Sequence, residues 1–158
     1  MKNKNKKILL LLLISYAVFR GARYIMRDRK REIDLMARTA WGEARGEGLR
    51  GMQAVLNVIQ NRVDAGKWYG RTAEEVVLKP YQFSCWNEND ANYLKMQRVD
   101  ENDVQFANAK GLAELSYDGD LLDITGGATH YHAAGITPNW AGSMQKTAVI
   151  GNHVFYKE

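Results

Sequence analysis

The 158-residue chain has very little cysteine, because Cys85 is its single copy. One thiol excludes an internal disulfide framework and any metal site made only of cysteine. Most of the net charge of +4 comes from two basic clusters, at residues 2–7 and 20–31, so no basic excess remains elsewhere. This distribution argues against a nucleic-acid-binding surface spread over the folded domain. The chain also lacks internal repeats, and its length predicts one domain.

The N-terminus has the pattern of a targeting segment. Four lysines at positions 2, 4, 6 and 7 precede an apolar run at 8–19, as in a signal peptide, and the run contains a small-x-small cleavage site at 15–17. The run is shorter than the ~20 residues that span a bilayer, but residues 21–26 would extend it if Arg20 and Arg23 snorkel. A buried core helix is a further alternative, which the basic flanks disfavour. We expect a signal peptide or signal anchor at 1–26, a basic linker and helix start at 27–34, and an exported domain at 35–158.

Helical periodicity dominates most of the domain. Apolar residues recur at helical spacing over 32–44 and 49–63. A capping pattern of Thr72 with Glu75 predicts a short helix through position 78, and Asp103 is expected to cap a helix over 104–116. Residues 20–31 read as a linker and 81–93 as a loop. Strands are expected at 128–132, 147–150 and 153–156, the last two forming a hairpin around Gly151-Asn152. The expected fold class is α+β, mostly helical, with a small C-terminal β-hairpin.

Two glutamates stand where the first of these helices meets a glycine break, in the run AWGEARGE at 40–47. Glu43 falls beside Met36 at the margin of the apolar stripe. A carboxylate there can be desolvated enough to keep its proton near neutral pH, as a general acid for glycosidic bond cleavage requires. Glu47 is a candidate second carboxylate, although its direction beyond the break cannot be read. From spacing alone, a helix-end glutamate and a solvated loop glutamate remain open alternatives.

The histidines and the cysteine offer competing chemistry. His130 and His132 would point to the same face of a strand, and His153 follows them, so a zinc site is one alternative. No carboxylate or cysteine nearby in sequence completes a familiar ligand spacing, and structural or substrate-contacting histidines fit equally. Cys85 has no histidine near it in sequence that would activate it as a nucleophile. The sequence predicts no metal and no cofactor.

Aromatic residues are numerous in the expected loops. Rings of this kind stack on sugar faces, and loops are where binding residues gather, although ordinary core filling accounts for about half of such rings. The candidate binding residues are Trp41, Tyr81, Gln82, Phe83, His130, Tyr131 and Trp140.

Several motifs together resemble the SleB-like cell wall hydrolase family. In that family an EARGE run is followed by a helix ending in NRV, and here WGEARGE at 41–47 is followed by VIQNRV at 58–63. The likeness continues at YQFS (81–84), GATHY (127–131) and IGNHVFY (150–156), so it spans residues 35–156 in order. The family includes spore cortex-lytic enzymes and related phage and bacterial proteins. The resemblance implies a lysozyme-like fold, similar to lytic transglycosylases, with its catalytic glutamate at Glu43.

The resemblance further implies an enzyme that cleaves the β-1,4 bond between N-acetylmuramic acid and N-acetylglucosamine. Glu43 would act as acid and then as base in a lytic transglycosylase. A hydrolase would normally use a second carboxylate, for which Glu47 and Asp64 are the local options. A lysozyme-type muramidase, an inactive membrane-tethered wall-binding module and a zinc amidase are the alternatives. The expected partners are peptidoglycan strands and, through the N-terminal segment, the inner membrane, with no nucleic acid. We expect a monomer at the cell wall, in phage endolysin-like lysis or in wall remodelling.

Overall fold

The structure, a computed structural model, describes the backbone of residues 2–158 and the side chains from residue 14 onward. The chain divides into two compact units, Met1–Arg31 and Glu32–Glu158. Helix α1 is assigned over Lys2–Ala44. The stretch at 20–31, which the sequence interpretation treated as a basic linker, is therefore helical. Arginine and lysine are good helix formers, and no proline interrupts the stretch.

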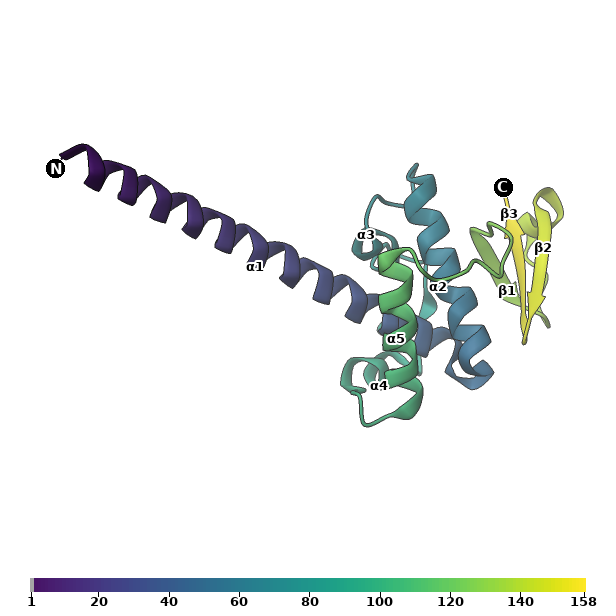
Figure 1. Cartoon of the computed structure of the whole chain (residues 1–158). Helices are drawn as coiled ribbons and strands as arrows, with labels where there is room; N and C mark the ends of the chain where they lie inside the picture. The colour runs from purple at the N-terminus through teal and green to yellow at the C-terminus, as the bar shows by residue number, and fades with distance from the viewer. Residues whose placement is uncertain (1) are drawn as a thin grey trace. The chain divides into compact units, whose positions relative to one another are not determined.

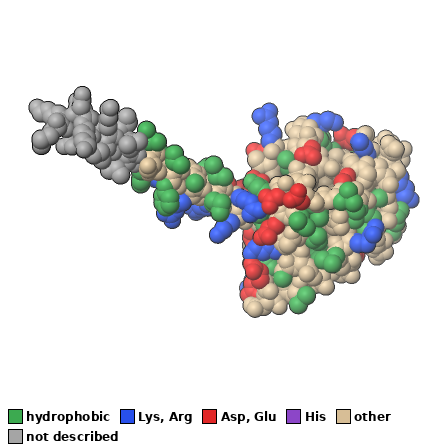
Figure 2. Space-filling view, in the orientation of Figure 1, with side chains coloured by type: hydrophobic (Ala, Val, Ile, Leu, Met, Phe, Trp, Pro, Cys, Tyr) green, Lys and Arg blue, Asp and Glu red, His purple; other side chains and the backbone are tan. Residues whose placement is uncertain are grey.

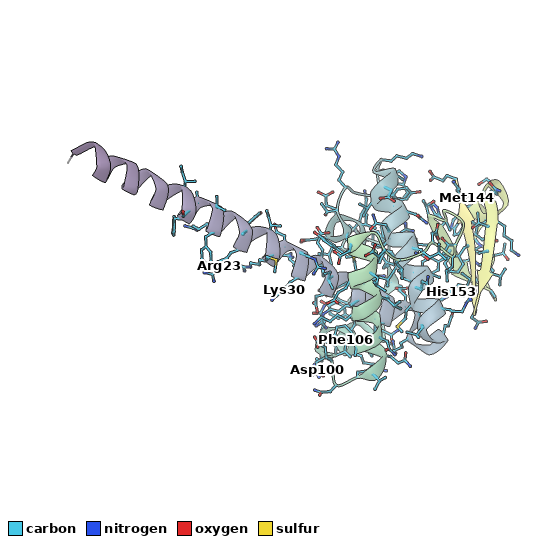
Figure 3. All side chains as sticks on the ribbon, in the orientation of Figure 1. Arg23, Lys30, Asp100, Phe106, Met144 and His153 are labelled. Carbon is cyan, nitrogen blue, oxygen red and sulfur yellow. The ribbon has the colours of Figure 1, made fainter. Side chains whose placement is uncertain are left out.

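The described part of the first unit exposes both aromatic and basic side chains (Figures 2 and 3). The guanidinium of Arg20 lies 5.8 Å from the Tyr16 ring centroid, and that of Arg23 lies 5.6 Å from the Phe19 centroid. Among the residues with described side chains, none forms a helix long and apolar enough to cross a membrane. The lysines at 2–7 and positions 8–13 of the predicted targeting segment lie outside those described side chains.

In the second unit, α1 ends at Ala44 and is followed by a single 3-10 turn, η1 (Arg45–Glu47), and by α2 (Gly48–Ala65). The predicted helix at 49–63 is confirmed to within two residues at each end, and the one at 32–44 is confirmed at its C-terminal end, whereas its start is wrong because α1 already begins at Lys2. Gly66 then ends α2 with a φ of 61°, a conformation that glycine adopts without a steric penalty.

The later helices are shorter. They are α3 (Ala73–Val77), η2 (Ser84–Trp86), α4 (Tyr93–Arg98), α5 (Val104–Asp118) and η3 (Asn139–Ser143). Thr72 Oγ1 accepts the Glu75 N–H at 3.1 Å, and Asp103 Oδ1 accepts the Phe106 N–H at 2.9 Å, so both predicted N-caps are confirmed. The sequence did not predict η2 or α4, because one or two turns are too short to show a helical period.

The main core forms where α1, α2 and α5 meet. Met36 of α1, Met52 and Leu56 of α2, and Phe106 of α5 are almost fully buried. Leu49, which the sequence placed inward, is 53% exposed because it lies in the first turn of α2. Figure 1 shows α3 and α5 on one side of α2 and the sheet on the other. Helix α2 therefore serves both the helical core and the sheet.

The sheet is antiparallel, with β1 (His130–Ala133), β3 (His153–Lys157) and β2 (Gln145–Ile150) in that order. The β2–β3 hairpin around Gly151-Asn152 is confirmed, and β1 adds to the free edge of β3. The register pairs Tyr131 with Phe155 and His130 with Tyr156. Because successive strand residues point to opposite faces, Tyr131 and Phe155 share the face that packs on α2, while His130 and Tyr156 share the other face. The expected fold class is confirmed.

Candidate active site

The Glu43 carboxylate lies in the last turn of α1, where three segments distant in sequence meet. Its Oε1 accepts the backbone N–H of Cys85 at 2.9 Å and the hydroxyl of Ser84 at 3.2 Å. Its Oε2 accepts the hydroxyl of Tyr131 at 3.0 Å. The side chain is half-buried, so the carboxylate is held in a fixed position and still reaches the surface.

Gly42 permits this arrangement by letting η2 approach α1 closely. A Cβ atom at this position would lie 2.8 Å from Cys85 Cβ, 3.1 Å from Cys85 Sγ and 3.3 Å from Met96 Sδ. Such distances are shorter than carbon and sulfur tolerate in a packed core. The absent side chain therefore allows the Cys85 N–H to reach the next residue of α1, which is Glu43.

Tyr131 reaches Glu43 from β1 and keeps its proton. Burial raises the pKa of its hydroxyl well above the usual value, and the adjacent Glu43 carboxylate raises it further. Its ring packs between Phe155, with centroids 5.6 Å apart, and His153, with centroids 5.1 Å apart at 84°. The hydroxyl is thus a fixed hydrogen-bond donor.

A buried cation, Arg62 of α2, lies behind the site with only 5% of its surface exposed. Its Nε donates to the Thr129 carbonyl at 2.7 Å, and its guanidinium lies 5.0 Å from the Phe83 ring centroid and 5.5 Å from that of Tyr69. Burial lowers the pKa of this group, while the nearby Glu43 carboxylate acts in the opposite direction. Arg62 adds a positive charge to the surroundings of Glu43. Its hydrogen bond to the Thr129 carbonyl holds the strand that carries Tyr131 against α2.

The Cys85 thiol is unsuited to act as a nucleophile. It is 1% exposed, and burial followed by the adjacent Glu43 raises its pKa well above the usual range. A thiol attacks as its thiolate, which this environment disfavours. The contribution of Cys85 to the site is its backbone N–H.

Glu47, the other predicted catalytic carboxylate, has its described polar contact with His153. Its side chain is 18% exposed, and Oε1 lies 3.0 Å from His153 Nδ1. Its Oε2 is fully buried and has no hydrogen-bond partner among the described residues. The glycine break turns the chain so that this carboxylate is enclosed beneath the β2–β3 turn rather than presented to a substrate.

Two of the predicted sugar-binding aromatics, Phe83 and Trp41, are core residues in the structure. Phe83 is 2% exposed and belongs to the main core. Trp41 is 5% exposed, donates its indole N–H to Asp103 at 3.2 Å, and has the Arg45 guanidinium 4.2 Å from its ring centroid. Neither ring has a free face on which a sugar could stack.

The remaining candidates divide between two places. Tyr81 is 90% exposed and Gln82 half-buried, and both lie in the loop that leads to Ser84 and Cys85, the two residues of this segment that bind Glu43. His130 packs against Trp140, with centroids 5.3 Å apart, on the opposite face of the sheet from Tyr131.

Strand alternation explains why the structure does not bring His130 and Trp140 together with Tyr131, as the sequence interpretation had grouped them. Burial lowers the pKa of His130, and Arg62 lowers it further.

The three histidines do not converge on one point. His132 stacks on Tyr156 on the outer face of the sheet, with ring centroids 5.3 Å apart, whereas His153 pairs with Glu47 on the inner face. Across the residues that the structure describes, no group of three or more His, Cys, Asp or Glu side chains is placed to hold a metal ion. This geometry does not favour the zinc amidase alternative.

Sequence reasoning missed several parts of the site. The Cys85 backbone N–H carries no sequence signal at all, because any residue supplies that group. Ser84 was visible only as part of a motif, and Arg62 only as the arginine of NRV. The position of Gly42 immediately before a candidate catalytic glutamate was a usable signal, since glycine within a helix usually marks a close approach.

Comparison with known proteins identifies relatives of the second unit. The family described as Cell Wall Hydrolase matches residues 46–156. The matched stretch begins three positions after Glu43, so it does not itself carry the role of that residue. A spore cortex-lytic enzyme of Bacillus cereus is 30% identical over 127 residues, covering 80% of this chain and 44% of the relative. One from Halalkalibacterium halodurans is 27% identical over 125 residues, covering 78% and 34%. The chain thus spans less than half the length of these curated relatives.

Solved structures support the same relationship. The catalytic domain of the Bacillus cereus SleB protein superposes with a TM-score of 0.65 at 29% identity, covering 81% of this chain and 91% of that one. The catalytic domain of the germination-specific lytic transglycosylase SleB from Bacillus anthracis gives a TM-score of 0.60 at 28% identity, covering 80% and 93%. The SleB-like resemblance and the lysozyme-like fold read from the sequence are confirmed.

Proposed function

The chain belongs to the Cell Wall Hydrolase family, and from that premise we propose that it degrades peptidoglycan as a lytic transglycosylase. The bond cleaved is the β-1,4 linkage between N-acetylmuramic acid and N-acetylglucosamine, and Glu43 is both the general acid and the general base. The observation that carries the proposal is the set of three hydrogen bonds on a single, half-buried carboxylate.

The two oxygens of Glu43 have different partners, which supports alternation between acid and base. A backbone N–H can only donate, so Oε1, bound to Cys85, remains an acceptor in both protonation states. The Tyr131 hydroxyl can donate to Oε2 in both states, because a protonated carboxyl oxygen keeps a lone pair, and the acidic proton is then free to face the substrate. The proton that moves during the reaction therefore resides on Oε2, and the contact with Tyr131 persists throughout.

The reaction follows from these roles. Glu43 donates its proton to the bridging oxygen as the bond between that oxygen and muramyl C1 breaks. The neighbouring acetamido group or a backbone carbonyl stabilises the oxocarbenium-like carbon. The carboxylate then takes the proton of the C6 hydroxyl as O6 bonds to C1, which yields the 1,6-anhydro product and restores the acid.

The surroundings of Glu43 favour this product over that of a muramidase. A hydrolase of the usual kind places a second carboxylate at a defined distance across the scissile bond. Glu47 is enclosed against His153, and Asp64, the other local option, accepts a hydrogen bond from Gln60 at the far end of α2. The contacts described for Glu43 come from donors only.

The experiment is digestion of purified peptidoglycan with Glu43→Gln. This variant keeps the shape of the side chain but cannot donate the proton, so we expect activity to fall ~10²–10⁴-fold with thermal stability unchanged. Glu114→Gln, at an exposed position of α5, is the matched control and should retain full activity. Mass spectra of wild-type fragments should show ends lacking one water. Hydrated reducing ends would indicate a muramidase, and a fully active Glu43→Gln would remove the assignment.

We also propose that residues 1–26 direct export, that residues 27–34 link them to the domain, and that the domain at 35–158 acts outside the inner membrane as a monomer. The charge distribution supports this division, because Glu32–Glu158 carries 12 Lys and Arg against 17 Asp and Glu, whereas the basic excess lies before it. Alkaline phosphatase fused after Glu158 should be active in intact cells. A silent fusion would mean that the C-terminus stays in the cytoplasm and that a partner releases the enzyme.

A further inference from the structure

Glu47 occupies an unusual position for a charged side chain. It lies beneath the β2–β3 turn, with Oε1 3.0 Å from His153 Nδ1 and Oε2 buried without a hydrogen-bond partner among the described residues. A carboxylate leaves water at a considerable cost unless something compensates its charge. The nearest described group able to compensate it is the imidazole of His153, which is itself only 12% exposed.

Two glycines make room for this carboxylate. A Cβ atom on Gly51 of α2 would lie 2.5 Å from Glu47 Cβ, and one on Gly151 of the β2–β3 turn would overlap Glu47 Oε2. Gly51 has helical backbone angles that any residue adopts, so the backbone conformation does not require glycine at this position. The space that a side chain would take there is filled by Glu47. Glu47 is thus enclosed by α2 on one side and by the hairpin on the other.

From Glu47 the contacts lead directly to the proposed catalytic group. His153 presents its ring edge-on to Tyr131, with centroids 5.1 Å apart at 84°, and Tyr131 donates to Glu43 Oε2 at 3.0 Å. Figure 3 labels His153 on the sheet beside α2. The rings of His153 and Phe155 enclose Tyr131, so the position of His153 determines where the tyrosine hydroxyl lies.

We propose that Glu47 and His153 form a positioning pair, which seats the β2–β3 hairpin on α2 and thereby holds the Tyr131 hydroxyl on Glu43. Neither residue touches the substrate. Both act through Tyr131, and the inference rests on the proposed role of Glu43. The second glutamate of the EARGE run therefore serves the first one indirectly, through a chain of contacts that crosses from η1 to the sheet and back to α1.

The test is a double-mutant cycle with kcat and KM measured on soluble peptidoglycan fragments. Tyr131→Phe removes one hydrogen bond to a charged group and should lower kcat ~10–100-fold. His153→Ala and Glu47→Gln should each lower kcat by about 10-fold with KM within about twofold. Either one combined with Tyr131→Phe should cause no further loss, because a residue that acts only through Tyr131 has nothing left to position.

His132→Ala is the matched control, since His132 lies on the opposite face of the same strand as Tyr131, and it should leave kcat unchanged. Glu47→Gln preserves the volume of the side chain. If His153→Ala fails to fold, the double-mutant cycle of Glu47→Gln with Tyr131→Phe still tests the inference. Three results would overturn the inference. The losses in kcat could multiply when either variant is combined with Tyr131→Phe, both single variants could keep the wild-type kcat, or His132→Ala could lose as much kcat as they do. An active Glu43→Gln would instead overturn the proposed function, so the two failures are distinguishable.

Discussion

The close approach at Gly42 yields a sharp prediction about both stability and activity. Gly42→Ala introduces a Cβ 2.8 Å from Cys85 Cβ and 3.1 Å from Cys85 Sγ. One of the two segments must shift, and overpacking of this kind typically costs ~1–3 kcal/mol. Replacing glycine by alanine within a helix contributes about 0.5–1 kcal/mol in the opposite direction. The steric effect and the helical effect therefore have to be separated.

Gly111→Ala provides that separation. Gly111 lies inside α5 with nothing within 4 Å of its added Cβ, so this variant should show only the helical gain. The difference between the two variants isolates the clash, which we expect to make Gly42→Ala less stable than Gly111→Ala by ~1–3 kcal/mol. For a domain of this size, each kcal/mol corresponds to about 3–5 °C in Tm.

The activity of Gly42→Ala should fall by more than its loss of stability alone would cause. A shift of η2 away from α1 withdraws the Cys85 N–H from Glu43 Oε1, and a hydrogen bond to a charged group is worth ~1.5–3 kcal/mol, or roughly 10–150-fold in rate. Thermal unfolding and peptidoglycan digestion of both variants are the assays. A Gly42→Ala protein as stable and as active as Gly111→Ala would show that η2 does not depend on this approach.

Three further outcomes are expected. Asp103→Ala should cost ~1 kcal/mol at pH 7, since Asp103 caps α5. The Phe106 N–H holds the pKa of Asp103 below its usual value. The stabilisation by Asp103 is therefore complete above the unfolded-state pKa of ~3.9 and is lost as the pH falls through the lower folded-state pKa. Urea titrations should accordingly show the stabilities of the wild type and the variant converging in acid. Cys85 should react with iodoacetamide only after unfolding, as mass spectrometry would show, and rapid labelling of the native protein would contradict its burial. Chelation should leave wall digestion unchanged, whereas loss of activity with restoration by zinc would favour an amidase.

The sequence predicted those parts of the fold that local patterns determine. A helical period placed α2, the Thr72 and Asp103 caps marked the starts of α3 and α5, and Gly151-Asn152 marked the hairpin. Each of these signals resides within a few consecutive residues. The addition of β1 to β3 depends on a pairing across more than twenty positions, and no local signal reports it.

The site was predicted in part, and its errors have physical causes. Glu43 and Tyr131 were both named, but their contact joins positions 88 apart in the chain and is visible only in the fold. His130 was grouped with Tyr131, although adjacent strand residues point to opposite faces, so the alternation rule alone would have separated them. Phe83 and Trp41 were taken for binding residues because an aromatic ring in a motif looks the same in sequence whether it is buried or exposed.

Glu47 illustrates why two nearby carboxylates need not form a catalytic pair. The turn η1 separates them, and beyond it Glu47 is enclosed by Gly51, Gly151 and His153, while Glu43 keeps a half-exposed carboxylate. A two-carboxylate mechanism requires both groups at the scissile bond. With Glu47 enclosed, the proposed mechanism assigns both proton transfers to Glu43, and its asymmetric hydrogen bonds, two donors on Oε1 and one tyrosine on Oε2, suit that double role.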